Sequence, residues 1–168
     1  DGLMLGICNG FQALVKLGLV PYGDIRPMDD ECPTLTFNTI GRHQSRLVRT
    51  RVASNLSPWL SQCEPGDIHT VAISHGEGRF VCSPELQHQL EVTGRIATQY
   101  VDEAGQPSMD WDVNPNGSVM AIEGITSPDG RVLGKMGHVE RRGDGLYKNV
   151  PGDKFMPLFE SGVKYFTD

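Results

Sequence analysis

The chain has 168 residues and a net charge of −6, with 21 acidic and 15 basic side chains, 20 glycines and 11 prolines. This length supports one hydrophobic core without metals or disulfides, and the composition is typical of a loop-rich α/β protein. No apolar run is long enough to span a bilayer, and an acidic chain is a poor general nucleic-acid binder. We therefore expect one domain whose partners are small molecules or proteins, with no nucleic acid and no membrane among them.

Four cysteines lie far apart in the chain and include no Cys-x-x-Cys pair. Their spacing indicates neither a zinc ribbon nor a dense disulfide framework, so we expect a reducing, cytoplasmic location and no metal site. There is no signal peptide, and the chain begins at Asp1. A doubly wound sheet normally has strands before the one that carries its catalytic corner, whereas here that strand comes first. We therefore expect an N-terminally truncated piece of a longer protein.

The first predicted elements are an apolar strand over residues 3–7 and a helix over 10–17, joined at Gly6-Ile7-Cys8-Asn9-Gly10. A strand–turn–helix corner with flanking glycines tolerates a strained central residue and leaves its side chain exposed at the end of the strand. The positive end of the helix favours a thiolate at Cys8. The pattern indicates a nucleophile, and the alternative is a buried cysteine on a strand.

The next predicted elements are mostly strands. Residues 34–53 have a β pattern with interleaved arginines, which indicates the solvated side of an edge strand or, alternatively, contacts to an anionic ligand. A strand over 67–74 ends at Ser74-His75-Gly76-Glu77-Gly78, and open α/β sheets bind ligands at such strand ends. The remaining elements, in chain order, are a helix from Ser83 to Val92, a strand over 96–101, a hairpin of strands over 119–125 and 131–136, and a C-terminal helix whose stripe Phe155, Leu158, Phe159, Val163 and Phe166 packs on the core.

A thiolate nucleophile needs a base, a group that orients the base, and donors for the oxyanion. His138 follows the last predicted strand, and Glu140 stands two residues later. In extended chain these two side chains project to the same side, so the carboxylate can bond one imidazole nitrogen while the other faces a thiol. Taken alone, a His-x-Glu pair is more often a surface pair. Together with the corner at Cys8 it indicates a catalytic triad.

These motifs resemble a known family. Cys8, followed about 130 positions later by His138 and Glu140, resembles the order of cysteine, histidine and glutamate in class I glutamine amidotransferases. The resemblance is closer to the glutaminase domains of phosphoribosylformylglycinamidine synthases and covers the chain from its start to at least Arg141. It is carried by Gly6-Ile7-Cys8-Asn9-Gly10-Phe11-Gln12, Ser74-His75-Gly76-Glu77-Gly78-Arg79, Asn114-Pro115-Asn116-Gly117-Ser118 and His138-Val139-Glu140-Arg141.

The resemblance implies a fold: an α/β, flavodoxin-like three-layer arrangement with a mainly parallel central sheet, the whole of 1–168 being part of one glutaminase domain. It also implies roles. Cys8 forms a glutamyl thioester, His138 moves the protons, Glu140 orients His138, and the backbone N–H of Asn9 is an oxyanion donor. The residues implied to position the substrate glutamine are Gln12, Ser74, His75, Gly76 and Glu77, mainly through backbone groups at the last two.

Two implied roles have open alternatives. His75 is either part of the glutamine site or a turn histidine satisfied by its own loop. The segment Asn114–Ser118 is either a plain turn or part of a contact with a synthetase.

The ammonia released from glutamine is expected to reach a synthetase domain or subunit. There it supports the ATP-dependent conversion of formylglycinamide ribonucleotide to formylglycinamidine ribonucleotide in purine biosynthesis. The chain has no Gly-x-x-x-x-Gly-Lys-Ser/Thr motif, so we expect no cofactor in it and place ATP and Mg²⁺ in the synthetase part.

The chain departs from the family pattern in two ways. Val139 and Gly137 stand where the family frequently has proline, which stiffens extended backbone. The glycine-rich loop that supplies a second oxyanion donor in the family precedes the nucleophile. Nothing stands before Asp1 to provide it, and losing such a donor costs on the order of a hundred- to a thousand-fold in rate. We therefore expect the isolated fragment to be weakly active or inactive.

Three other interpretations remain. The nearest is the glutaminase of another biosynthetic amidotransferase. The second is a non-catalytic docking or regulatory module that keeps the fold. The third is a cysteine peptidase-like or stress-response enzyme on a similar scaffold, against which Gln12 and the turn at Ser74–Gly78 argue.

Overall fold

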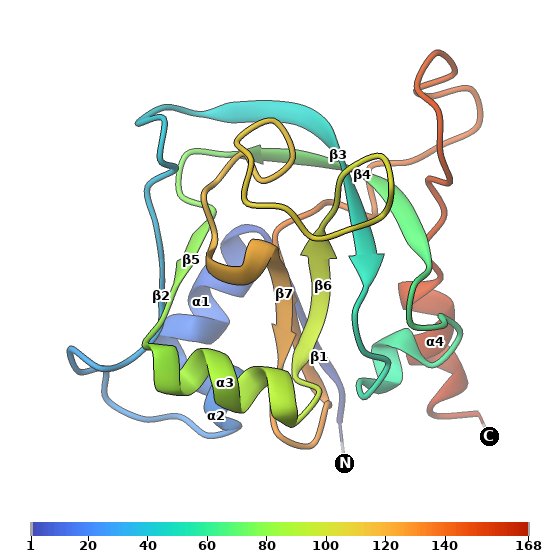
Figure 1. Cartoon of the computed structure of the whole chain (residues 1–168). Coiled ribbons are helices and arrows are strands. Elements are labelled where there is room, and N and C mark those ends of the chain that lie inside the picture. Colours follow the sequence, from blue (N-terminus) through green and yellow to red (C-terminus); the bar gives the residue numbers. More distant parts are fainter. Residues whose placement is uncertain (1, 168) are drawn as a thin grey trace.

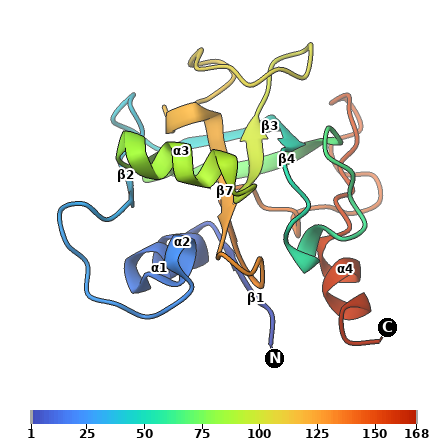
Figure 2. The same ribbon diagram turned by 60° about the horizontal axis from the view of Figure 1, so that its bottom comes forward.

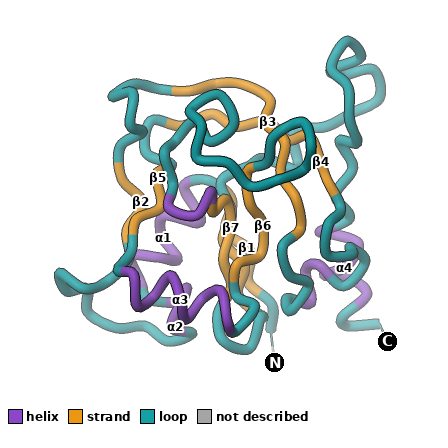
Figure 3. The backbone as a smooth tube through the Cα atoms, in the orientation of Figure 1, coloured by secondary structure: helices purple, strands orange, loops and turns teal. Residues whose placement is uncertain are grey.

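The computed structural model describes residues 2–167. The described part of the chain is made of strands, helices and short 3₁₀ turns (η) (Figures 1 and 3). The elements are β1 (Met4–Ile7), α1 (Asn9–Leu17), α2 (Leu19–Tyr22), β2 (Thr34–Thr36), β3 (Gln44–Val52), η1 (Pro58–Leu60), β4 (Ile68–His75), β5 (Arg79–Val81), α3 (Pro84–Val92), β6 (Ile96–Tyr100), η2 (Val119–Ala121), β7 (Ile122–Thr126), β8 (Val132–Lys135) and α4 (Leu158–Lys164).

The main sheet has six strands in the order β1-β8-β7-β6-β3-β4, and β2 pairs with β5 in a separate two-stranded sheet. Within the described residues only β1 and β8 pair in parallel, and every other pair is antiparallel. The expectation of a mainly parallel sheet is therefore wrong for this chain. Parallel neighbours need a long crossover connection. The strands β7 and β8 are instead joined by a tight turn, in which the Gly130 N–H donates to the Ser127 carbonyl at 3.0 Å.

Helices cover both sides of the main sheet, which confirms the three-layer α/β expectation. Helices α1, α2 and α3 lie on one side, and η1 and α4 lie on the other (Figures 1 and 2). Each side has its own cluster of buried apolar residues. Phe11 and Leu90 belong to the first cluster, and Leu60 and Leu158 to the second. The amphipathic pattern of α1 explains its place, because Phe11, Leu14 and Val15 are its buried residues.

Strand β3 lies inside the sheet and not at its edge. It pairs with β4 along almost its whole length and with β6 at Thr50–Val52. Its arginines Arg49 and Arg51 are half-buried and alternate with the buried residues Val48, Thr50 and Val52. The interleaved charges therefore mark the solvated face of an interior strand, and the edge position that we expected for it belongs to β4.

The C-terminal helix α4 presents most of its apolar stripe to solvent, contrary to the sequence expectation. Phe159, Val163 and Phe166 are 45%, 65% and 62% exposed. The helix packs on η1 through small residues instead: a Cβ added at Gly162 would lie 2.3 Å from the Trp59 ring. Because this close approach sets the rotation of α4, Phe159 and Val163 turn outward while Leu158 stays buried.

Candidate active site

Cys8 occupies the corner that the sequence predicted. It has φ 55° and ψ −108°, a strained conformation for a residue with a Cβ, and it directly precedes α1. Gly6 makes the corner possible, because a Cβ there would lie 2.7 Å from the backbone of Gly10. The Cys8 N–H donates to the Lys135 carbonyl at 2.8 Å, and the Cys8 carbonyl accepts from Gln12 N–H at 3.1 Å. The nucleophile candidate is thus held by both the sheet and the helix.

The parallel pairing of β1 and β8 places His138 at the same sheet edge as Cys8. In this register Ile7 faces Lys135, so Cys8 follows the end of one strand and His138 follows the end of its neighbour. Glu140 bonds the His138 ring as expected, with 2.5 Å between Nδ1 and Oε1. The other ring nitrogen, Nε2, is buried and has no partner. The imidazole therefore has one nitrogen oriented by a carboxylate and one available.

Strand β4 contacts both Cys8 and His138. The Cys8 Sγ lies 3.7 Å from the Ser74 carbonyl oxygen, to which it donates a weak hydrogen bond. The backbone N–H of His138 donates to the Ala72 carbonyl at 2.7 Å. Carbonyls two residues apart on a strand point to the same side, so Cys8 and His138 lie against one edge of β4.

The electrostatics of Cys8 differ from the sequence expectation of a favoured thiolate. Burial raises the pKa of the Cys8 thiol above its ordinary value of 9.0, while the backbone N–H of Asn9 and the charge of Arg141 act in the opposite direction. Glu140 also raises it. The free protein thus holds a neutral thiol, and a base is needed to take its proton during attack.

The rim turn, residues Ser74–Gly78, lies beside α1 and the nucleophile. The Gln12 side-chain amide donates to the Glu77 carbonyl at 2.6 Å, which ties the first turn of α1 to the rim turn. His43 Nε2 and Ser74 Oγ lie 3.1 Å apart, and the Asn38 N–H donates to the Gly76 carbonyl at 2.9 Å. The five residues predicted to position glutamine are therefore gathered within one hydrogen-bonded region next to Cys8.

His75 is part of the rim turn, and its side chain is buried beneath the backbone of that turn. It is 4% exposed, and neither ring nitrogen has a partner. Burial lowers the pKa of His75 to about 4, helped by the neighbouring His43 and His138. The ring packs against Gly78, where a Cβ would lie 2.2 Å from the imidazole Cε1. The ring therefore fills the space beneath the turn, and a role of His75 in glutamine binding stays a prediction.

The segment Asn114–Ser118 supports the rim turn from below. Asn116 donates to the Gly78 carbonyl at 2.9 Å and to the Tyr100 hydroxyl at 2.7 Å, and the Ser118 hydroxyl donates to the same carbonyl at 3.2 Å. Asn114, Asn116 and Ser118 are at most 1% exposed. Buried side chains cannot touch a separate subunit, so these three do not form a synthetase contact.

Sequence reasoning missed Asn38, which fixes the rim turn from a loop. Its side chain donates to the His75 carbonyl at 2.9 Å and accepts the Gly78 N–H at 3.1 Å. The only signal for it was an asparagine between two short β patterns, which is too common to select.

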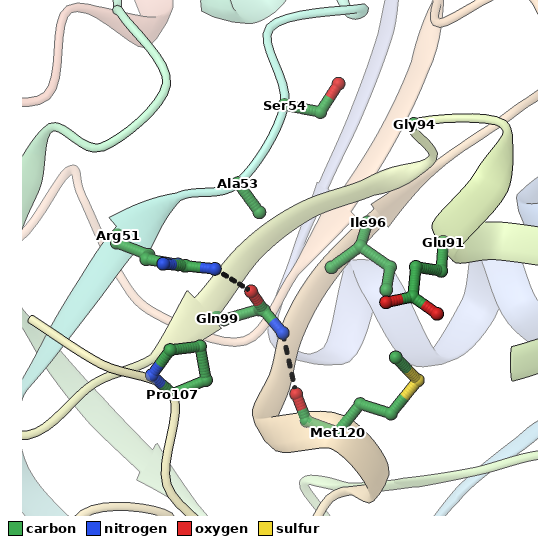
Figure 4. Close-up of a pocket in the computed structure, with 9 residues that line it drawn as sticks. All are labelled: Arg51, Ala53, Ser54, Glu91, Gly94, Ile96, Gln99, Pro107 and Met120. Atoms are coloured by element: carbon green, nitrogen blue, oxygen red, sulfur yellow. Dashed lines mark hydrogen bonds between the residues drawn. The ribbon is translucent and has the colours of Figure 1, made fainter. Parts of the chain in front are cut away.

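A separate pocket lies at the junction of β3, β6 and the end of α3 (Figure 4). Arg51 donates to the Gln99 side chain at 3.0 Å, and Gln99 donates to the Met120 carbonyl at 2.8 Å. The pocket contains no residue of the predicted site, and these bonds join three of its lining residues to one another. Across residues 2–167, no three metal-ligating side chains gather where they could hold an ion, and no helix is long and apolar enough to cross a membrane.

Comparison with known proteins decides the family. A family model of the CobB/CobQ-like glutamine amidotransferase domain matches residues 1–166. The chain belongs to this amidotransferase family. Its class I amidotransferase-like fold accounts for the placement of Cys8 at the corner between β1 and α1.

This amidotransferase chain is similar to a curated protein and to a solved structure. Over 166 residues it is 36% identical to "Phosphoribosylformylglycinamidine synthase subunit PurQ" of Synechococcus sp. (strain JA-2-3B'a(2-13)), covering 99% of the chain and 63% of that protein. It is similar to a chain of the solved structure of PurLQS from Thermotoga maritima, with a TM-score of 0.69 and 27% identity over 98% of this chain and 62% of that one. The chain thus spans somewhat less than two thirds of the length of these relatives.

Proposed function

We propose that the protein carrying this chain hydrolyses glutamine at Cys8 and passes the ammonia to the synthesis of formylglycinamidine ribonucleotide. One observation carries the catalytic part: in the parallel pair β1–β8, Cys8 directly follows one strand and the His138–Glu140 pair comes shortly after the other. Family membership and the similarity to a phosphoribosylformylglycinamidine synthase subunit support the choice of substrate and pathway.

In the proposed reaction, His138 takes the Cys8 proton as Sγ attacks the side-chain amide carbon of glutamine. The resulting oxyanion accepts a hydrogen bond from the backbone N–H of Asn9. In the free protein the same N–H acts to lower the pKa of the Cys8 thiol. His138 then gives its proton to the leaving amine, so ammonia departs and a glutamyl thioester remains. Water, deprotonated by His138, hydrolyses the thioester to glutamate. Glu140 holds the His138 ring in one tautomer through these steps.

We place the glutamine beside the rim turn, because Gln12 and the backbone of Gly76 and Glu77 lie there next to the thiol. The ammonia acceptor, ATP and Mg²⁺ belong to a synthetase domain or subunit in this proposal. The names of the two relatives, a synthase subunit and PurLQS, support such a partner.

A labelling experiment tests the nucleophile. The intact protein is incubated with a diazoketone analogue of glutamine, and the adduct is mapped by mass spectrometry. We expect one adduct, on Cys8. We also expect Cys8→Ser to abolish ammonia release from glutamine, while Cys82→Ser, at a half-buried cysteine with a pKa of about 11, retains it. Labelling of another cysteine, or equal ammonia release by Cys8→Ser, would exclude the proposed mechanism.

The acceptor needs its own assay, because glutaminase chemistry is common to many amidotransferases. The intact protein and its synthetase partner are supplied with glutamine, ATP and formylglycinamide ribonucleotide. Product formation that depends on Cys8 supports the proposal. Glutamine hydrolysis without product supports the glutaminase of another biosynthetic pathway, and absence of both supports a docking module.

A further inference from the structure

A fully buried ion pair lies behind the candidate triad, at a place that no sequence motif marked. Glu123 on β7 and Lys135 on β8 have no exposed side-chain surface, and Lys135 Nζ lies 3.0 Å from Glu123 Oε1. Removing two charges from water is costly, and apolar residues of similar size often fill such a site with equal or greater stability. The contacts of this pair therefore need an explanation beyond stability.

Both charges bind the backbone of Gly137, the residue before His138. Lys135 Nζ donates to the Gly137 carbonyl at 3.0 Å, and the Gly137 N–H donates to Glu123 Oε1 at 2.5 Å. The other carboxylate oxygen of Glu123 accepts a hydrogen bond from the Thr98 hydroxyl on β6. The ion pair thus holds both polar backbone groups of one residue and is itself oriented by a neighbouring strand.

Lys135 also connects this arrangement to the nucleophile. Its backbone carbonyl accepts the Cys8 N–H, while its side chain binds Gly137. One residue therefore contacts the backbone of Cys8 and the backbone next to His138. A displacement of Lys135 would therefore disturb the backbone at both Cys8 and Gly137.

A side chain at position 137 would force its neighbours to shift. A Cβ there would lie 2.6 Å from Val71 Cγ2 and 2.8 Å from Glu123 Oε1. The residue must also donate its N–H, which proline cannot do. In the family that the sequence resembles, proline is frequent here and stiffens the chain. In this chain the side chains of Glu123 and Lys135 restrain the backbone through their hydrogen bonds to Gly137.

We propose that Glu123 and Lys135 are positioning residues that fix the His138 imidazole relative to Cys8 by holding the Gly137 peptide groups. This inference rests on the proposed function, in which His138 transfers protons to and from the reacting atoms. Displacement of a catalytic group by about 1 Å costs on the order of a hundred-fold in rate. Loss of the pair therefore lowers kcat and leaves the binding of glutamine at the rim turn unchanged.

The test replaces the pair as a unit. The double variant Glu123→Met/Lys135→Met, made in the intact protein, keeps the side-chain volumes and leaves no unpaired charge. We expect a cooperative thermal transition, a KM for glutamine within about two-fold of wild type, and a kcat lowered about ten- to a hundred-fold. Hydrogen exchange at the amides of residues 137 and 138 should accelerate at least ten-fold relative to the amides of β7. Unchanged kcat together with unchanged exchange would overturn the inference.

A milder variant decides the question if the double variant does not fold. Thr98→Val removes the hydroxyl that orients Glu123 and keeps the ion pair. Its matched control is Thr126→Val, because the Thr126 hydroxyl is also buried but has no partner. We expect a fall in kcat and faster exchange at 137 and 138 for Thr98→Val alone, and equal behaviour of the two variants would refute the role of Glu123. If wild-type protein shows no Cys8-dependent hydrolysis, the proposed function fails, while the exchange measurement still decides whether the pair holds this segment.

Discussion

The buried imidazole of His75 predicts a pH dependence of stability that can be measured without any substrate. The ring is 4% exposed, and both of its nitrogens lack partners. Burial therefore lowers the pKa of His75 from 6.5 to about 4 in the folded protein. The unfolded chain binds a proton to this residue at higher pH than the folded chain does. The contribution of the neutral ring to the unfolding free energy is fully present above pH 6.5. It decreases as the pH falls and is lost at about pH 4.

The size of the effect follows from the two pKa values. Each unit of difference corresponds to about 1.4 kcal/mol, so the lowered pKa of His75 amounts to about 3 kcal/mol of unfolding free energy. This is a large fraction of the 5–15 kcal/mol stability typical of a domain. His69 also has a pKa lowered by burial and contributes in the same pH range. Replacing His75 alone should therefore reduce the pH dependence without abolishing it.

The assay is urea denaturation of wild type and His75→Leu in steps between about pH 7 and pH 4. We expect wild type to lose about 3 kcal/mol more than the variant over this range. The control His88→Gln, at an exposed histidine on α3, should follow wild type. If His75→Leu loses as much unfolding free energy as wild type, the ring is protonated in the folded protein and its description as a neutral, buried group is wrong.

Three further predictions concern the same region. Gly78→Ala places a Cβ against the His75 ring and should lower the unfolding free energy by about 1–3 kcal/mol in urea denaturation, whereas Gly76→Ala meets no atom within 4 Å and should lower it less. Asn116→Ala leaves the Gly78 carbonyl without one donor and should lower the unfolding free energy by about 1–3 kcal/mol and raise the KM for glutamine. An unchanged KM would show that this hydrogen bond does not affect glutamine binding. Alkylation of Cys8 in the free protein should show an apparent pKa above 9.0, and a midpoint near neutrality would contradict the effect of burial.

The local chemistry of the site was predictable because each part depends on neighbours in the chain. Gly6 and Gly10 predict the corner at Cys8, and the two-residue spacing of His138 and Glu140 predicts their contact. The sheet pairing was less predictable, since the choice between parallel and antiparallel neighbours depends on long-range connections. Similarly, the stripe of α4 was assigned to the core, because a periodic pattern does not reveal that Gly162 packs directly on Trp59.

By itself, the sequence predicted the class of protein and selected the candidate nucleophile, base and orienting group. These depend on residue type and short spacing, which local backbone geometry translates directly into structure. Only the tertiary structure decided how these groups meet. The parallel pair β1–β8 joins positions about 130 residues apart, the buried pair Glu123–Lys135 holds the backbone before His138, and burial raises the pKa of Cys8 where the helix end alone would lower it. Such features arise from desolvation and from contacts between distant segments, and neither is encoded in a local pattern.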